Sequence, residues 1–317
     1  MATTLLVFFL LGCRGAESIE GVSLTVDAQR DSWNGGQVVQ TANYRIYTTV
    51  RDPMLNQYLP GFMEAAHGNY VSLTHLLPAD SPQPLDMYVL GTKDEWADLT
   101  RHRLGDQAKL YLQLDAGGYC LNGVCVLWNI GPIPTLAVAS HEGLHQFLWG
   151  RLKDRIPIWA EEGLCTVAEG IDLYNNTVLF TPEKNVHRYA DLRKAIIQSY
   201  WVGLDDLLQM NGADAISRKP GQSTGYYGQL WSLILYIRSL GEYRSGFHQM
   251  LQDAQDGKLY ETIGMTADDI NPMRQNPESF SQQLSISAFR HYISKDMETF
   301  EEGWREFAYQ LVDIPSK

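Results

Sequence analysis

Two histidines four positions apart carry the clearest chemical signal in this sequence. His141 and His145 fall in the pentapeptide His-Glu-Gly-Leu-His, inside a stretch from Thr135 to Trp149 with helical character. Residues four apart lie one above the other on a helix face, so both imidazoles can reach one metal ion. Zinc suits such a site because it accepts neutral imidazole, and a catalytic zinc takes three protein ligands and one water. The side chain of Glu142 is turned partly off that face, where it can reach the water bound to the metal.

A carboxylate that could complete the site lies on the next expected helix. Gly150 is placed to end the first helix, and Pro157 permits a second one that runs to Gly170. His145 lies about one turn before the first helix ends, and Glu162 about one turn into the second. If the two helices pack antiparallel, Glu162 faces the histidines. The alternative, two packed or surface histidines on an amphipathic helix, is thereby disfavoured.

The spacing of these residues resembles that of the gluzincin, or peptidase-MA-like, zinc metallopeptidases, in the form of a bacterial lipoprotein branch. The shared pattern is His-Glu-x-x-His at 141–145 followed by Trp159-x-x-Glu162-Gly163. This match covers roughly residues 135–170, and a looser resemblance extends over most of the chain. The resemblance implies a thermolysin-like zincin fold.

The resemblance also implies a mechanism and a ligand set, with zinc bound by His141, His145 and Glu162. Glu161 is the alternative third ligand, because only one of the two adjacent carboxylates can point at the metal. Glu142 would accept a proton from the attacking water and pass it to the leaving amine. A metzincin is excluded, because Arg151 stands where that family has its third histidine.

Further site residues are expected from the same resemblance. Gluzincins commonly supply a tyrosine to the oxyanion from a helix downstream of the third ligand. Here Tyr226 or Tyr227 is the candidate, and ordinary packing is the alternative for both. From helix spacing alone, Thr166, one turn after Glu162, could hydrogen-bond a ligand, and Glu169, two turns after it, could orient a histidine. Ordinary helix residues are the alternative for both. The other histidines show no ligand spacing and are interpreted as structural or surface residues.

The N-terminus indicates export. Residues 5–11 form an apolar run too short to span a bilayer and suited to the core of a signal peptide. Leu10-Leu11-Gly12-Cys13 resembles a bacterial lipobox, which implies cleavage before Cys13 and a lipid anchor on it. No Lys or Arg precedes the run, so a plain secretory signal is the alternative. The expected location is the cell envelope, anchored to the membrane by lipid, or otherwise the periplasm or the exterior.

The cysteines are consistent with an oxidising compartment. Cys120 and Cys125 flank an Asn-Gly pair, a strong signal for a hairpin turn. Two cysteines across such a turn could form a disulfide, with two reduced buried thiols as the alternative. Cys165, three residues after Glu162, is expected to be a packed core residue without a catalytic role.

Composition limits the partners. The chain has 317 residues, 44% of them hydrophobic, which suffices for a large core. Its net charge of −12 argues against binding nucleic acid, whose phosphates require a basic surface. The expected partner is a peptide or protein substrate; the oligomeric state is not indicated.

The order of elements predicts an α+β fold, with a mostly antiparallel sheet packed on the metal-binding helix and a helical C-terminal part. Strands are expected at 43–50, at 85–90 and twice within 111–128, and helices at 55–76, 93–103, 186–200, 203–210, 226–240 and 286–311. The predicted divisions are a signal segment 1–13, a tether 14–40, a catalytic part 41–170 and a helical subdomain 171–317. The hairpin strand nearest the metal-binding helix could pair with an extended substrate.

Three functions remain to be compared. An active zinc peptidase is favoured over a non-catalytic binding or scaffold lipoprotein that retains the zincin fold. The intact Glu142 favours this choice, because a binding protein has no need of a general base. A zinc hydrolase acting on a non-peptide amide is the third possibility.

Overall fold

A computed structural model describes residues 21–79, 83–114, 117–210, 222–270 and 277–315. It confirms the α+β class and contains a six-stranded sheet of order β2-β3-β4-β5-β7-β6. The strands of this sheet are β2 (Gln29–Trp33), β3 (Gly36–Gln40), β4 (Tyr44–Thr48), β5 (Leu85–Leu90), β6 (Gly118–Leu121) and β7 (Val124–Trp128). The predicted signal segment 1–13, with Cys13 of the expected lipobox, lies outside the described residues.

Across the described ranges, no helix combines the length and the apolar character needed to cross a membrane.

The sheet is mixed. The pairs β2–β3, β3–β4 and β6–β7 are antiparallel, whereas the central pairs β4–β5 and β5–β7 are parallel. Parallel neighbours need a crossover connection, which is usually helical. Here α1 (Pro53–Thr74) connects β4 to β5, and α2 (Lys93–Leu104) follows β5 before the chain returns through β6 to β7.

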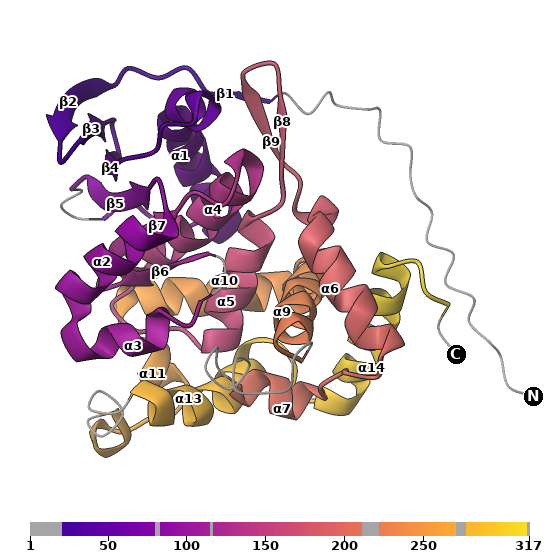
Figure 1. Cartoon of the computed structure of the whole chain (residues 1–317). Helices are drawn as coiled ribbons and strands as arrows, with labels where there is room; N and C mark the ends of the chain where they lie inside the picture. The colour runs from indigo at the N-terminus through magenta and orange to yellow at the C-terminus, as the bar shows by residue number, and fades with distance from the viewer. Residues whose placement is uncertain (1–20, 80–82, 115–116, 211–221, 271–276, 316–317) are drawn as a thin grey trace, which may run out of the picture.

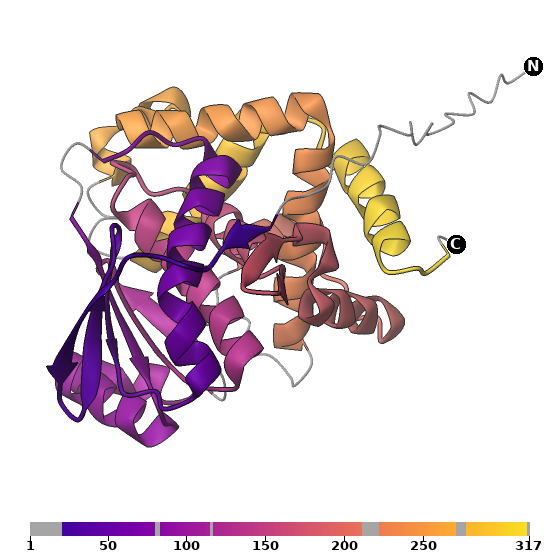
Figure 2. The ribbon, with the colours of Figure 1, turned by 90° about the horizontal axis from the view of Figure 1, so that it is seen from above.

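Helices cover both faces of this sheet (Figure 2). On β7, Cys125 and Leu127 join the main core. This core includes α1 and α4 (Pro132–Trp149), the helix that carries His141 and His145. The alternate residues Val126 and Trp128 join a second cluster, with Trp96 of α2. Because successive side chains of a strand point to opposite faces, β7 is buried on both sides and fixes the sheet between two helical layers.

The predicted tether over 14–40 is wrong for its second half. Residues 29–40 form the β2–β3 hairpin, and β1 (Val22–Ser23) pairs with β9. The turn has left-handed backbone at Asn34 and Gly35, with φ of 38° and 75°. Asn and Gly tolerate that conformation, and an Asn-Gly pair is typical of a hairpin turn. The hairpin was missed because the surrounding residues are polar, as in a linker.

The predicted helical subdomain 171–317 begins with a hairpin instead, formed by β8 (Ile171–Tyr174) and β9 (Thr177–Phe180). Helices then follow as predicted, with α10 and α11 added and the expected helix 286–311 divided in two. The division occurs because Asp296 accepts a hydrogen bond from the Thr299 amide and starts a new helix. The helices are α6 (Val186–Ile197), α7 (Leu204–Gln209), α9 (Gln222–Ser239), α10 (Gly241–Asp256), α11 (Leu259–Thr262), α13 (Pro277–Tyr292) and α14 (Met297–Leu311).

The helices α4 and α5 (Ile158–Ala168) lie between the sheet and the C-terminal helices (Figure 1). Two contacts clamp α4: the Tyr70 hydroxyl of α1 donates to the Ser140 carbonyl, and the Ser140 hydroxyl donates to the Ala168 carbonyl of α5, each at 2.8 Å. A Cβ at Gly143 would lie 2.6 Å from the Tyr70 hydroxyl, and one at Gly163 would collide with Ile234 of α9. Gly143 therefore permits the close contact of α4 with α1, and Gly163 permits that of α5 with α9.

Candidate metal centre

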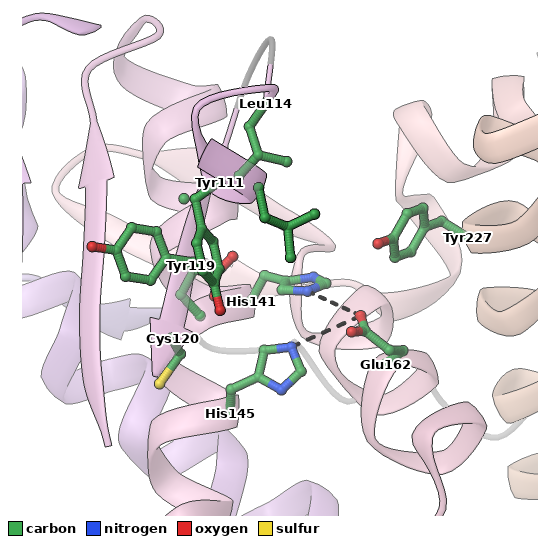
Figure 3. Close-up of a pocket in the computed structure, with 11 residues that line it drawn as sticks. Tyr111, Leu114, Tyr119, Cys120, His141, His145, Glu162 and Tyr227 are labelled. Atoms are coloured by element: carbon green, nitrogen blue, oxygen red, sulfur yellow. Dashed lines mark ion pairs between the residues drawn. The ribbon is translucent and has the colours of Figure 1, made fainter. Parts of the chain in front are cut away.

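The motif residues converge where α4 faces α5. Glu162 Oε2 lies 3.4 Å from His141 Nε2 and 3.8 Å from His145 Nε2 (Figure 3). The three side chains are largely buried, with 13 to 19% of each exposed. The structure thus brings together the three residues that the sequence predicts as ligands, in the antiparallel arrangement that the short connection allows.

Each histidine has a carboxylate on its other ring nitrogen. His141 Nδ1 lies 2.7 Å from Glu169 Oε1, and His145 Nδ1 lies 2.7 Å from Glu161 Oε1. A carboxylate accepts hydrogen bonds, so these contacts assign a proton to each Nδ1 and leave each Nε2 as the atom for a metal. Glu161 therefore contacts the Nδ1 side of His145. It does not lie at the position of the third ligand, for which it was the alternative to Glu162.

The donor set fits a divalent cation. Glu162 Oε2 is buried and has no hydrogen-bond partner within the described structure, and it faces two imidazole Nε2 atoms. A buried carboxylate oxygen without a partner is costly, and a cation between it and the two nitrogens would satisfy all three atoms. Zinc bonds of about 2.0–2.2 Å place ligand atoms about 3.4 Å apart in a tetrahedral site, which is close to the separations observed.

A second set of donors overlaps the first. One ligand atom each of His141, His145 and Cys165 lies within 4.8 Å of the other two, so this group could hold a metal ion. Cys165 is fully buried, as predicted for a core residue, but it adjoins the imidazoles. We give Glu162 precedence as the third ligand because its oxygen faces the same Nε2 atoms that the carboxylates leave free.

Arg188 of α6 is a site residue that the sequence gave no reason to select. Its Nε and Nη2 donate to Glu169 at 2.8 and 2.7 Å, and its guanidinium lies over the Tyr227 ring, 5.1 Å from the centroid. Asn185 adds a third donor to Glu169 at 3.0 Å. These contacts hold Glu169 against His141. Glu169 thus orients a histidine, as its position after Glu162 suggested. Thr166 was a candidate to hydrogen-bond a ligand, but its hydroxyl donates to the Gly163 carbonyl of its own helix at 2.7 Å.

The charges of the site are set by burial and by mutual contacts. Burial raises the pKa of Glu142, against the opposing effect of the two histidines. Glu169 is equally buried, but Arg188 and His141 outweigh burial and lower its pKa to about 2. In the same way burial opposes protonation of His141, yet Glu162 and Glu169 raise its pKa to about 9. Cys165 is raised by burial to a pKa of about 12, which makes its free thiol a poor nucleophile.

The histidine pKa predicts how stability depends on pH when no metal is present. The folded pKa of His141, about 9, exceeds its ordinary value of 6.5, so proton binding stabilises the folded state. That contribution is complete below pH 6.5 and is lost as the pH rises through about 9. The free energy of unfolding, measured with denaturant in the presence of a chelator, should fall by up to roughly 3 kcal/mol over this window.

His141→Gln should weaken that pH dependence. Part of it should remain, because Cys165 and Glu162 outweigh burial and raise the pKa of His145 as well. His102→Gln, at an exposed position on α2, should retain the full dependence. An unfolding free energy that stays level or increases between pH 6.5 and 9 in the wild-type protein would contradict the prediction.

A cavity of about 260 Å³ opens beside the donor set. Glu142 and Tyr227 line it, and Figure 3 shows the Tyr227 hydroxyl directed toward the space beside Glu162 and His141. Tyr226 is buried instead, with its hydroxyl 3.4 Å from the Met210 carbonyl. Of the two predicted tyrosines, the structure therefore brings only Tyr227 to the site. The opposite wall is apolar and aromatic, and no sequence motif marks its residues, Leu110, Tyr111, Leu114 and Tyr119.

The β6–β7 hairpin is tied to the same site. Cys120 and Cys125 lie directly opposite each other, as expected, and both are free thiols in the structure. The Cys125 thiol donates to the Glu142 carbonyl at 3.0 Å. Gln146 of α4 donates to the Gly123 carbonyl in the hairpin turn at 2.7 Å. The hairpin is thereby held in register with the motif helix.

The scan against protein-family models matched no family, and the searches of curated proteins and of solved structures found no match.

Proposed function

We propose that this protein is a zinc-dependent metallopeptidase of the gluzincin type, with a thermolysin-like zincin fold. The family assignment rests on the motif residues alone. One observation carries the proposal: Glu162 Oε2, which has no hydrogen-bond partner among the described residues, lies near both Nε2 atoms, while carboxylates engage both Nδ1 atoms. Two imidazoles oriented in this way, with a third anionic donor, are the usual ligand set of a catalytic zinc site.

When bound by His141, His145 and Glu162, zinc would polarise a substrate carbonyl and make water acidic enough to attack it near neutral pH. Glu142, beside the cavity, accepts the proton of that water and delivers it to the leaving nitrogen. Its raised pKa suits both roles, because a base that must later act as an acid works best near the operating pH. Tyr227 has a pKa raised by burial and by Glu162, so its phenol is protonated and can donate a hydrogen bond to the oxyanion.

An extended peptide is the substrate that the sheet supports. β6 is at the edge of the six-stranded sheet, and Gly118, Tyr119 and Cys120 of this strand line the cavity. An edge strand offers unpaired backbone groups to which a peptide can add as another strand. This feature favours a peptidase over an enzyme for a small non-peptide amide.

We also propose that the protein works in the cell envelope, anchored through Cys13. This rests on the N-terminal sequence. Membrane association of the full chain that persists in Cys13→Ser would refute the anchor.

Zinc content and peptide cleavage together test the proposed activity. The purified chain should hold zinc in a one-to-one ratio by elemental analysis and cleave a mixed peptide library at defined bonds, as read by mass spectrometry. Zinc without cleavage of any peptide would favour the binding or scaffold alternative. A protein that takes up no zinc would refute the metallopeptidase.

The adjacent tyrosines provide a matched pair of variants. Tyr227→Phe should lower kcat by roughly 10²–10³-fold, the usual cost of losing one oxyanion donor, with little change in KM. Tyr226→Phe should leave kcat near the wild-type value, because its hydroxyl is directed at Met210 rather than at the cavity. Steady-state kinetics on one cleaved peptide measures both. Equal effects of the two substitutions would contradict the assignment.

A further inference from the structure

All the cysteines that the structure describes gather at the candidate site, but in different positions. Cys120 lines the cavity, and Cys125 lies beneath the Glu142 backbone. Cys165 alone joins the two histidines in a group with ligand spacing. It stands one helical turn after Glu162 on α5 and so presents its sulfur on the side that faces α4.

Four potential donors therefore meet where these two helices face each other. The ligand atoms of His141, His145 and Cys165 lie within 4.8 Å of one another, and Glu162 Oε2 adds a buried oxygen without a hydrogen-bond partner. A purely structural core would not place a thiol beside two imidazoles and a carboxylate oxygen that lacks a hydrogen bond. Thiolate sulfur and imidazole nitrogen are the ligands zinc prefers, and four protein ligands make a closed site.

We propose that Cys165 is a fourth, displaceable protein ligand of the metal, which closes the centre at rest and must leave before a substrate is hydrolysed. The inference rests on the proposed function, since it requires the metal. On coordination the thiol gives up one proton to solvent, and on release the sulfur takes one back, so the exchange needs no oxidant. The centre would then alternate between a closed state with four protein ligands and an open state with three.

Cobalt substitution of the full chain tests this ligand directly. Co²⁺ in the wild-type protein should show a thiolate-to-cobalt charge-transfer band in the near ultraviolet, and Cys165→Ser should abolish it. Cys120→Ser and Cys125→Ser are matched controls and should retain the band. X-ray absorption of the zinc form should find one sulfur at about 2.3 Å among nitrogen and oxygen neighbours. Zinc affinity should fall by roughly tenfold or more in Cys165→Ser, because one bonded donor is lost.

The outcomes separate the two proposals. Bound cobalt with only nitrogen and oxygen ligands in the wild-type protein would overturn the role of Cys165 and leave the metallopeptidase intact. A band that survives Cys165→Ser but disappears in Cys120→Ser would likewise overturn it. A wild-type protein that binds no cobalt or zinc would overturn both proposals. Cys165→Ala, compared with wild type by circular dichroism, gives a second variant if the serine disturbs folding.

Discussion

Replacing Glu142 with glutamine should abolish peptide hydrolysis and leave the zinc in place. Glutamine has nearly the same shape as glutamate but cannot accept the proton of the attacking water. Because general-base catalysis commonly contributes 10²–10⁴-fold, kcat should fall by roughly that factor or more. Glu142 lies beside the ligand set and is not a member of it, so the zinc content should stay at one per chain.

The measurement combines elemental analysis with kinetics on one cleaved peptide. Glu142 is 8% exposed and has a raised pKa, so its neutral replacement should not destabilise the fold. A thermal unfolding curve at or above the wild-type midpoint would show this. Glu142→Gln that cleaves at the wild-type rate would refute the assigned general base.

The adjacent carboxylates Glu161 and Glu162 should differ sharply in their effect on the metal. Glu162→Gln removes the anionic donor that faces both Nε2 atoms, so zinc affinity should fall by well over about 100-fold. Glu161→Gln keeps a hydrogen-bond acceptor beside His145 Nδ1 but loses its charge, and a loss of roughly 10–100-fold is expected for such a neighbour of a ligand. Competition with a chromophoric chelator measures both affinities at one pH.

The reverse order of the two affinities would identify Glu161 as the ligand, the alternative that the sequence left open. Equal and small effects would mean that neither carboxylate binds the metal. Peptide hydrolysis should follow the zinc content in Glu162→Gln and recover in part when excess zinc is added.

Much of the site could be predicted because its parts are local. The motif on one helix, a glycine at Gly150 and a proline at Pro157 were enough to bring Glu162 opposite His145, since a short connection between helices leaves few ways to pack them. The choice between Tyr226 and Tyr227 could not be made in advance. Consecutive residues differ by about 100° around a helix, and only the packing of α9 decides which one faces the cavity.

Long-range contacts were beyond prediction. Arg188 lies 19 residues after Glu169 on another helix, and no spacing rule connects them. Three residues of the apolar wall, Leu110, Tyr111 and Leu114, come from a segment before the hairpin, which nothing in the sequence relates to the motif. The β2–β3 hairpin could have been found from Asn34-Gly35, but polar residues on an exposed edge strand also have the composition of a linker.

The carboxylates that contact the two histidines also determine the net charge of the site. Glu142, Glu161, Glu162 and Glu169 bring four negative charges to the centre when ionised, and Arg188 offsets one of them. Two protons on the imidazoles, or one divalent cation between them, supply the same two positive charges. Uptake of the metal by His141, His145 and Glu162 is then an exchange of two protons for one ion at constant local charge, and the proposed binding of Cys165 would release a third proton. The exchange of two protons for one ion leaves the net charge between the helices unchanged. The helices α4 and α5 can therefore keep the same positions in the metal-free protein.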